Sequence, residues 1–442
     1  LKLLEIIPTE YTKKEVVEFF QDYGKLFLGK TTVLCKDTPA FISNRIGIYA
    51  ILKDVQSMQK LGLGIDEVDR LTGTAIGRPK SATFRTSDIV GLDTLIKVAN
   101  NLYESLENDE QREMFKLPEI IYELEKKNWL GEKTKQGFYK KTKDKKGKTE
   151  ILTLDLKTFE YKPKKKVKFA SIGASKAIDD LKQKFKILFS GKDTATQFYK
   201  DSFYGLFQYI TYRITEITDD LYKIDEGIKA GFGWQMGPFE TWDALGVENT
   251  LNGMEDAGYN PAEWVYQMLE KGHSSFYMVK EGVRQYYDIP SESMMTIPGM
   301  ESFIILDNIR DNNLVWNNAG CSILDLGDGI LNVEFQSKMN TMGGEVLEGI
   351  HKGIDLAEQD YRGLVVGNQG QNFTVGANLG VLFMYAIEQE YDEIDLIVNH
   401  FQQTIMRARY SSIPVVVAPH TLTLGGGCEL AMHADIVQAA AE

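Results

Sequence analysis

The sequence predicts a multidomain protein in which a duplicated all-α region is followed by an α/β domain. The duplication rests on a set of short segments that recurs with a period of about 159 residues (225 − 66): Ile65-Asp66-Glu67, Gly77-Arg78-Pro79 and Asp88 to Asp93, then Ile224-Asp225-Glu226, Gly237-Pro238-Phe239 and Asp243 to Val247. That spacing is too long for a solenoid, so it indicates two related helical subdomains. From about Ser322 onward, shorter strand-like runs alternate with helical ones, which indicates a separate α/β domain.

Length and composition set the limits on function. A chain of 442 residues is too long for one ordinary core, so two or three domains are expected. The net charge of −13 argues against general nucleic-acid binding. Three widely separated cysteines, Cys35, Cys321 and Cys428, imply no disulfide framework and fit a reducing cytosol. There is no run of about 18 apolar residues and no charged-then-apolar leader, so neither a membrane span nor a signal peptide is predicted.

Two segments of the first 170 residues carry local predictions. Thr38-Pro39 is expected to cap a long helix that carries Phe41, Ile42 and Ile46 and ends near Gly62 or Gly64. The lysine-rich stretch from Lys140 to Lys148 and from Lys162 to Lys166 is interpreted as a loop-like, solvated linker between the repeats, with a localisation or nucleic-acid patch as the weaker alternative.

Two motifs are rejected on their context. Gly24 to Thr31 fits the phosphate-binding pattern G-x-x-x-x-G-K-T, which needs a strand before it and a helix after it. Here a helix pattern precedes and a strand pattern follows. No metal site is predicted, because the cysteines lack ligand spacing and Glu429 with His433 supplies only two ligands.

The clearest chemical signal is the run Leu424-Gly425-Gly426-Gly427-Cys428-Glu429-Leu430. It follows a strand-like stretch, Pro414 to Ala418, and leads into a helix-like run. Glycine lets a ligand approach main-chain N–H groups, which are unpaired at a helix N-terminus. Glu429 follows Gly426 by three residues, so it lies about one helical turn further along. The run therefore predicts an oxyanion-binding N–H with an acid/base group beside it.

A matching junction lies 49 residues earlier (426 − 377). Tyr361 to Gly367 is expected to be a buried strand, followed by Asn372 to Leu379 and then a helix. Taken alone, each junction fits a tight turn of an α/β fold better than a binding site. Together they resemble the enoyl-CoA hydratase/isomerase (crotonase) superfamily, with its F-x-x-G-A-[DN]-[LI] and G-G-G-x-E segments. The resemblance implies a ββα-spiral domain in which Ala377 and Gly426 give the oxyanion-hole amides and Glu429 is one of two catalytic glutamates.

The first 290 residues resemble the 3-hydroxyacyl-CoA dehydrogenase family. The resemblance is carried by Leu1 to Ile7, Cys35 to Arg45, both repeats, and Gly131-Glu132-Lys133 with Gly137-Phe138-Tyr139. It implies a duplicated all-helical C-terminal region behind a dinucleotide-binding domain. Glu5 would match the glutamate that orients the catalytic histidine, and Asn44 the asparagine that hydrogen-bonds the reacting oxygen. Without the resemblance, both residues would be interpreted as ordinary structural side chains.

The resemblance also predicts that functional parts lie outside the sequence. The histidine is expected about twelve residues before Glu5, and the second hydratase glutamate near position 449. We therefore expect an internal fragment that neither binds NADH nor oxidises 3-hydroxybutyryl-CoA. The intact parent would use NAD. The expected domains are the tail of a Rossmann-type domain (1–36), repeat 1 (37–140), the basic linker (141–168), repeat 2 (169–290) and a C-terminally truncated crotonase-like domain (299–442).

The predicted function is a cytoplasmic enzyme of fatty-acid β-oxidation that joins NAD-dependent 3-hydroxyacyl-CoA oxidation to enoyl-CoA hydration. Its implied partners are an acyl-CoA thioester, further copies of itself and a thiolase. Two alternatives stay open: a non-catalytic acyl-CoA-binding or assembly protein, and a crotonase-type isomerase or hydrolase in which Glu429 alone transfers protons.

Overall fold

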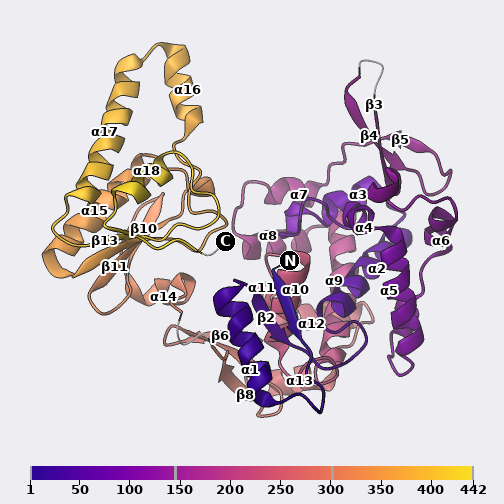
Figure 1. Ribbon diagram of the computed structural model, residues 1–442. Coiled ribbons are helices and arrows are strands. Elements are labelled where there is room, and N and C mark those ends of the chain that lie inside the picture. Colours follow the sequence, from indigo (N-terminus) through magenta and orange to yellow (C-terminus); the bar gives the residue numbers. More distant parts are fainter. Residues whose placement is uncertain (1, 144–146, 300–302, 441–442) are drawn as a thin grey trace. The chain divides into compact units, whose positions relative to one another are not determined.

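The computed structural model describes residues 2–143, 147–299 and 303–440. It divides into two compact units, one formed by residues 1–278 with 285–295, and the other by residues 279–284 with 296–442. Figure 1 follows the chain through both units. Among the described residues, no helix combines the length and the apolar character needed to cross a membrane.

The first unit is mostly helical. Its helices are α1 (Lys14–Asp22), the π-helical turn η1 (Tyr23–Phe27), α2 (Ser43–Leu61), α3 (Ile65–Leu71), α4 (Phe84–Val90), α5 (Leu92–Ser105), α6 (Glu119–Lys126), α7 (Ala170–Ser175), α8 (Leu181–Ser190), α9 (Thr194–Arg213), α10 (Leu221–Phe232), α11 (Pro238–Leu245), α12 (Val247–Asp256) and α13 (Glu263–Glu270), with short 3₁₀ turns η2 (Thr74–Ile76), η3 (Arg112–Phe115) and η4 (Glu132–Thr134). The two longest, α2 and α9, pack against each other.

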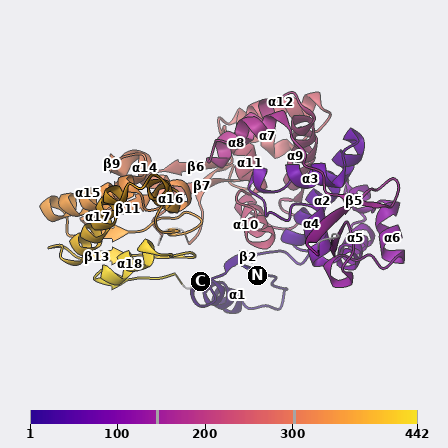
Figure 2. The same cartoon turned by 90° about the horizontal axis from the view of Figure 1, so that it is seen from above.

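A pair of parallel strands opens this unit. Strands β1 (Leu3–Ile6) and β2 (Thr31–Leu34) pair in register from Leu3 with Thr31 to Ile6 with Leu34. They contact α1 on one side and α10 on the other (Figure 2). Because η1 precedes β2 and no helix follows Thr31 directly, Gly24 to Thr31 lacks the context of a phosphate-binding loop.

Each helical repeat ends in a three-stranded sheet, which corrects the expectation of an all-α region. The first sheet has the order β3 (Tyr139–Lys143), β4 (Thr149–Leu154), β5 (Tyr161–Pro163), and the second has the order β6 (Tyr277–Lys280), β7 (Val283–Asp288), β8 (Ser293–Thr296). The supposed loop-like linker at 141–168 therefore contains most of the first of these sheets, although its residues 144–146 lie outside the described part. Thr153 and Leu154 are buried, and the Thr153 hydroxyl donates to Asp66, so this sheet packs onto α3.

The duplication is confirmed at the level of hydrogen bonds, but its register differs from the predicted one. In each repeat one aspartate accepts two N–H groups at the start of a helix and a tyrosine hydroxyl: Asp69 from Phe84, Arg85 and Tyr139, and Asp225 from Phe239, Glu240 and Tyr277. Asp225 therefore matches Asp69 and not Asp66, so the period is 156 residues here (225 − 69). The other predicted match, Asp88 with Asp243, is right, since each accepts two N–H groups where the terminal sheet begins.

The Asp225 carboxyl gives stability a pH dependence that can be measured. Burial, followed by the charge of Glu240, raises the pKa of Asp225 to about 7. The unfolded value is about 3.9, so folding favours the protonated form. This contribution is complete below about pH 4 and is lost as the pH rises through about 7. We expect the unfolding free energy of the wild type, relative to Asp225→Asn, to fall between pH 5 and pH 8 in urea titrations; a constant difference would contradict the assignment.

The second unit is an α/β domain built on one mixed sheet. The strand order is β14 (Ile436–Val437), β13 (Val415–Val417), β12 (Gly363–Val366), β11 (Ile330–Phe335), β10 (Cys321–Asp325), β9 (Leu314–Asn317). Strands β11 to β14 run parallel, and β9 to β11 antiparallel. The helices are α14 (Leu306–Asn313), α15 (Gly344–Asp360), α16 (Leu379–Glu388), α17 (Tyr391–Arg409) and α18 (Gly426–His433), with the 3₁₀ turn η5 (Lys338–Asn340). The core lies between α15 and the inner strands, where Val333, Ile350, Ile354 and Val366 have no exposed surface.

Candidate active sites

The two predicted glycine junctions lie side by side in the second unit. β12 and β13 are neighbouring parallel strands, so their carboxyl ends meet at one edge of the sheet. Beyond that edge, Thr374 pairs with Thr423: the Thr374 N–H donates to Leu422 O (3.1 Å), and the Leu424 N–H donates to Thr374 O (3.1 Å). Residues 374–377 and 423–426 are thereby brought together, as expected for two halves of one site.

Two glycines allow this close approach. Gly376 has φ +84°, and a Cβ on it would lie 2.8 Å from Leu424 O. A Cβ on Gly427 would lie 2.0 Å from Thr374 Cγ2. Thr374 itself is fully buried, donates to Asn340 O and accepts the Gly376 N–H (3.0 Å). A side chain at either position would push the two junctions apart. Glycine is therefore required at Gly376 and Gly427 by packing, and at Gly376 also by the backbone conformation.

The N–H groups of Ala377 and Gly426 donate no hydrogen bond within the described part of the chain. Gly426 is the first residue of α18, where an N–H has no partner in its own helix. Ala377, however, precedes α16 by two residues, which corrects the expectation that both amides begin helices. Ala377 forms a bridge with Met342, and the hydrogen bond of this bridge runs from the Met342 N–H to Gly376 O (2.9 Å). The bridge therefore does not use the Ala377 N–H, which stays unpaired.

Glu429 lies in the first turn of α18 and its side chain is exposed. Under Gly426 lie two apolar side chains that the sequence did not single out: a Cβ there would be 2.8 Å from the Phe401 ring and 3.5 Å from Met342 Sδ. Phe401 belongs to α17. The sequence separation between Phe401 and Gly426 does not indicate this contact.

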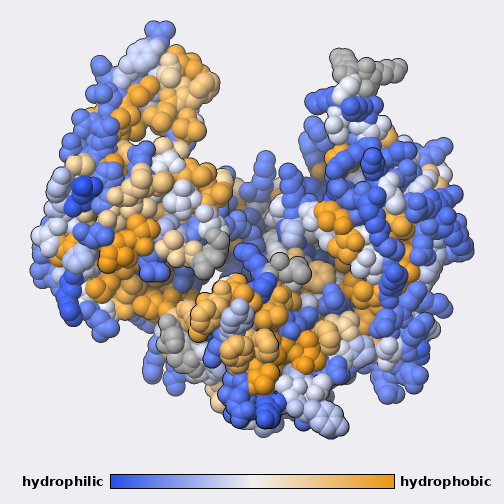
Figure 3. Space-filling view, in the orientation of Figure 1, coloured by the Kyte–Doolittle hydropathy of each residue, from blue (hydrophilic) through white to orange (hydrophobic). Residues whose placement is uncertain are grey.

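Helix α16 begins beside this site with apolar side chains on its surface. Leu379, Phe383 and Ile387, which are spaced by four residues, are 73%, 66% and 63% exposed. Apolar residues gather over this part of the second unit in Figure 3. The site therefore joins unpaired N–H groups and a carboxylate to an apolar surface.

In the first unit the structure brings Glu5 to the start of α2, where Asn44 lies. Glu5 Oε1 accepts the N–H of Ser43 (2.9 Å) and of Ile42 (3.2 Å). Asn44, the second residue of α2, is exposed. Glu5, on β1, thus contacts the residue directly before Asn44, which lies 39 positions from Glu5 in the sequence, on the first turn of α2.

The thiol of Cys35 lies beside Glu5 but is unreactive. Its Sγ lies 3.8 Å from Glu5 Oε1 and 3.6 Å from Val33 O. Burial, followed by the charge of Glu5, raises the pKa of the Cys35 thiol to about 12. The thiol therefore stays protonated at neutral pH and acts as a hydrogen-bond donor. It is not a nucleophile in this form, because only the thiolate is nucleophilic.

The residues present do not form a dinucleotide site. Among the described residues, the first unit has one two-stranded parallel sheet, β1 with β2, and the sequence has no G-x-G-x-x-G turn. A pyrophosphate needs such a turn between a strand and a helix N-terminus.

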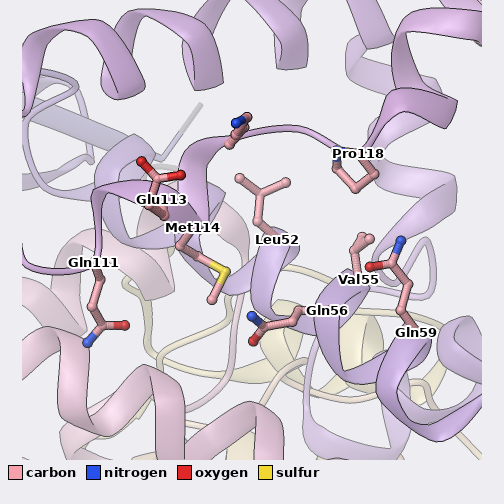
Figure 4. Close-up of a pocket in the computed structure, with 9 residues that line it drawn as sticks. Leu52, Val55, Gln56, Gln59, Gln111, Glu113, Met114 and Pro118 are labelled. Atoms are coloured by element: carbon pink, nitrogen blue, oxygen red, sulfur yellow. The ribbon is translucent and has the colours of Figure 1, made fainter.

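A separate cavity of about 350 Å³ lies in the first unit between α2 and residues 111–118 (Figure 4). Gln56, Gln59 and Gln111 are among the residues that line it. The Gln111 Nε2 atom has no hydrogen-bond partner in the described part of the chain, but it is buried and so is not exposed to the cavity. Leu52, on the cavity wall, is eight residues from Asn44 along α2, which is about 12 Å. The cavity is thus distinct from the Glu5–Asn44 pair.

Comparisons with known families agree with this division. Residues 41–141 and 206–287 match the family model described as 3-hydroxyacyl-CoA dehydrogenase, C-terminal domain. Residues 325–442 match the model described as enoyl-CoA hydratase/isomerase. Two parts of the chain are therefore similar to segments of these two enzyme families. The dehydrogenase match covers both halves of the duplication, and the hydratase/isomerase match contains Ala377, Gly426 and Glu429.

Relatives of the whole chain carry both segments in one protein. A protein of Bacillus subtilis (strain 168) named as a 3-hydroxyacyl-CoA dehydrogenase is 42% identical over all of this chain and 55% of its own length. One of Rickettsia prowazekii (strain Madrid E), named as a fatty acid oxidation complex trifunctional enzyme, is 24% identical over 99% of this chain and 56% of its own. The chain thus spans about half the length of these relatives. An enoyl-CoA hydratase structure from Thermoplasma volcanium GSS1 is 27% identical over 28% of this chain and 48% of its own, with a TM-score of 0.25.

Proposed function

We propose that the second unit binds the thioester carbonyl of an enoyl-CoA and belongs to an enoyl-CoA hydratase. The observation that carries this proposal is the pair of unpaired N–H groups, Ala377 and Gly426, on chain segments that lie side by side next to Glu429. Two such donors stabilise the negative charge that develops on a carbonyl oxygen during addition to the conjugated double bond. The apolar side chains of α16 beside Ala377 support an acyl group as the rest of the ligand.

In this proposal Glu429 transfers a proton during hydration. As water oxygen bonds to Cβ, a carboxylate takes one proton from that water, and a carboxyl group gives a proton to Cα. The double bond is consumed and no oxidant is needed. Hydration uses two carboxyl groups, so Glu429 would need a second one, which the resemblance places about twenty residues further on. An isomerase or hydrolase that relies on Glu429 alone is the second candidate.

For the whole protein we propose fatty-acid β-oxidation, with NAD-dependent oxidation of 3-hydroxyacyl-CoA as the step that follows hydration. The support is the dehydrogenase match over the first unit and the meeting of Glu5 with the helix that carries Asn44. Hydration makes the 3-hydroxyacyl thioester that this oxidation consumes. A cytoplasmic location and a homo-oligomer that associates with a thiolase belong to the same proposal.

The oxyanion assignment is tested by Gly426→Pro with Gly426→Ala as its matched control. Proline is tolerated at the first helical position and has no N–H, while alanine keeps the N–H. Both variants place a Cβ against Phe401, so they share the steric effect of that atom. The probe is a cinnamoyl-CoA thioester, whose absorption moves to longer wavelength when its carbonyl is polarised. We expect the shift on binding to fall by about half in Gly426→Pro, because one of two donors is lost, and to persist in Gly426→Ala.

Equal spectral shifts in the two Gly426 variants would show that the Gly426 N–H does not bind the thioester carbonyl. A chain that binds the thioester with no spectral shift at all would favour the non-catalytic acyl-CoA-binding alternative.

A further inference from the structure

Helix α2 begins without a cap from its own neighbourhood. The first N–H groups of a helix have no partner within it, and a side chain just before the helix usually accepts one of them. Before α2 stands Ile42, which has no such oxygen. Glu5, 37 residues earlier, accepts the N–H groups of Ile42 and Ser43 instead.

The turn that leads into α2 is strained. Ala40 and Phe41 are consecutive residues in the left-handed region, with φ of +62° and +52°. A Cβ disfavours this conformation, and for a bulky residue it is a true outlier, so the surroundings must hold the turn in place. Because of this turn α2 begins at Ser43, several residues after the start that Thr38-Pro39 predicted.

The second repeat supplies an internal comparison. Helices α2 and α9 each precede the helix that carries the matched aspartate, Asp69 or Asp225. α9 starts with an ordinary cap, since Asp193 accepts the Thr196 N–H (3.0 Å), and residues 191–194 have no positive φ. The second residue of α2 is Asn44, whereas the second residue of α9 is Ala195. The remote cap and the strained turn thus occur in the copy that carries the amide side chain.

We propose that Glu5 is a positioning residue that fixes Asn44 by anchoring the strained turn and the first turn of α2. The proposal rests on the dehydrogenase function proposed above and adds a second task for the same carboxylate. Oε1 is occupied by the two helix N–H groups. Oε2 makes no hydrogen bond in the described part of the chain, so it remains open to a partner of the reacting site. One carboxylate would then set the distance between that partner and Asn44.

Reach and charge can be separated by two variants of the full chain. Glu5→Asp keeps the charge but is one methylene too short, while Glu5→Gln keeps the reach and an acceptor oxygen. We expect hydrogen exchange at Ile42 and Ser43 to accelerate about ten-fold or more in Glu5→Asp and to stay near the wild-type rate in Glu5→Gln. Asp193→Ala is the matched control in the other repeat, and it should accelerate exchange at Thr196 and leave α2 unchanged. If hydrogen exchange at Ile42 and Ser43 kept its wild-type rate in Glu5→Asp, the proposal that Glu5 anchors the start of α2 would be wrong.

The effect on Asn44 needs its own readout, because a general loosening of the unit would also change exchange. In a chain labelled with ¹⁵N-asparagine, the side-chain signals of Asn44 are identified by their loss in Asn44→Asp. We expect these signals to shift or split in Glu5→Asp and to regain their positions in Glu5→Gln, while those of Asn100 and Asn101 on α5 do not move. Phe41→Gly, which accepts positive φ without strain, should reduce the change in the Glu5→Asp background.

Unchanged Asn44 signals in Glu5→Asp, or equal movement of all asparagine signals, would reject the positioning role. Neither measurement uses substrate. A longer protein without dehydrogenase activity would therefore refute the proposed function while leaving the anchor of α2 to be decided by these two results.

Discussion

Replacing Glu429 with glutamine is expected to lower the hydration rate of crotonyl-CoA by about 10²–10⁴-fold, the usual contribution of a positioned acid or base. Glutamine has nearly the same shape but cannot take or give the proton. The variant leaves the N–H groups of Ala377 and Gly426 untouched, so binding of the thioester should change little. The measurement is the loss of enoyl absorbance in an active protein that carries this chain, together with the dissociation constant of a saturated acyl-CoA.

The position of Glu429 supports this separation of rate from affinity. It lies in the first turn of α18, its side chain is exposed, and its main-chain carbonyl accepts from His433 Nδ1 (2.7 Å) within the helix. His433→Ala is therefore a suitable control, since it removes that helix contact and leaves the carboxylate in place. A normal hydration rate in Glu429→Gln would make the residue structural. A rate lost in parallel with acyl-CoA affinity would show that the site had collapsed.

The approach of the two glycine junctions could be predicted because its signals are local. β12 and β13 were expected from apolar runs, and the glycines after them mark the close approach that the structure shows between Gly376 and Leu424 O. What the sequence could not supply is the pairing of Ala377 with Met342, which leaves the Ala377 N–H unpaired without a helix. The role of Phe401 beneath Gly426 depends on how α17 packs, and an apolar stripe alone does not reveal it.

The first unit shows the same limit more strongly. The group Ile-Asp-Glu occurs in α3 and α10, but the matched carboxylates are those that reach the next helix, Asp69 and Asp225. Local similarity was therefore offset by three residues from structural equivalence. The positive φ of Phe41 could not be predicted either, because it is held by a carboxylate 36 positions away. The lysine-rich strand β3 was hidden by its charge, although it pairs with β4, whose last residues Thr153 and Leu154 are buried.

The largest expected loss of stability is in Asp109→Asn, which disrupts a buried charge cluster between α2, α9 and the segment before η3. Asp109 Oδ2 accepts from Arg45 Nη2 (2.7 Å) and from Tyr209 (2.9 Å), and lies 2.8 Å from Arg213 Nη1. The side chains of Arg45 and Arg213 are 0% and 4% exposed. Removing one partner of such buried charges typically costs about 3–5 kcal/mol, because the remaining ions cannot be solvated.

Glu110→Gln provides the matched control for this prediction, since Glu110 pairs with the same Arg213 (2.5 Å) but is 41% exposed. Water can replace an exposed partner, so its removal should cost less than about 1 kcal/mol. Four of the five tryptophans, at positions 129, 234, 242 and 264, lie in the first unit, so urea unfolding followed by tryptophan fluorescence in a Trp316→Phe background reports on that unit alone. If the two variants lost similar stability, burial would not be what makes Asp109 important. If Asp109→Asn cost less than 1 kcal/mol, the carboxylate of Glu216, which also contacts both arginines, would be sufficient to balance them.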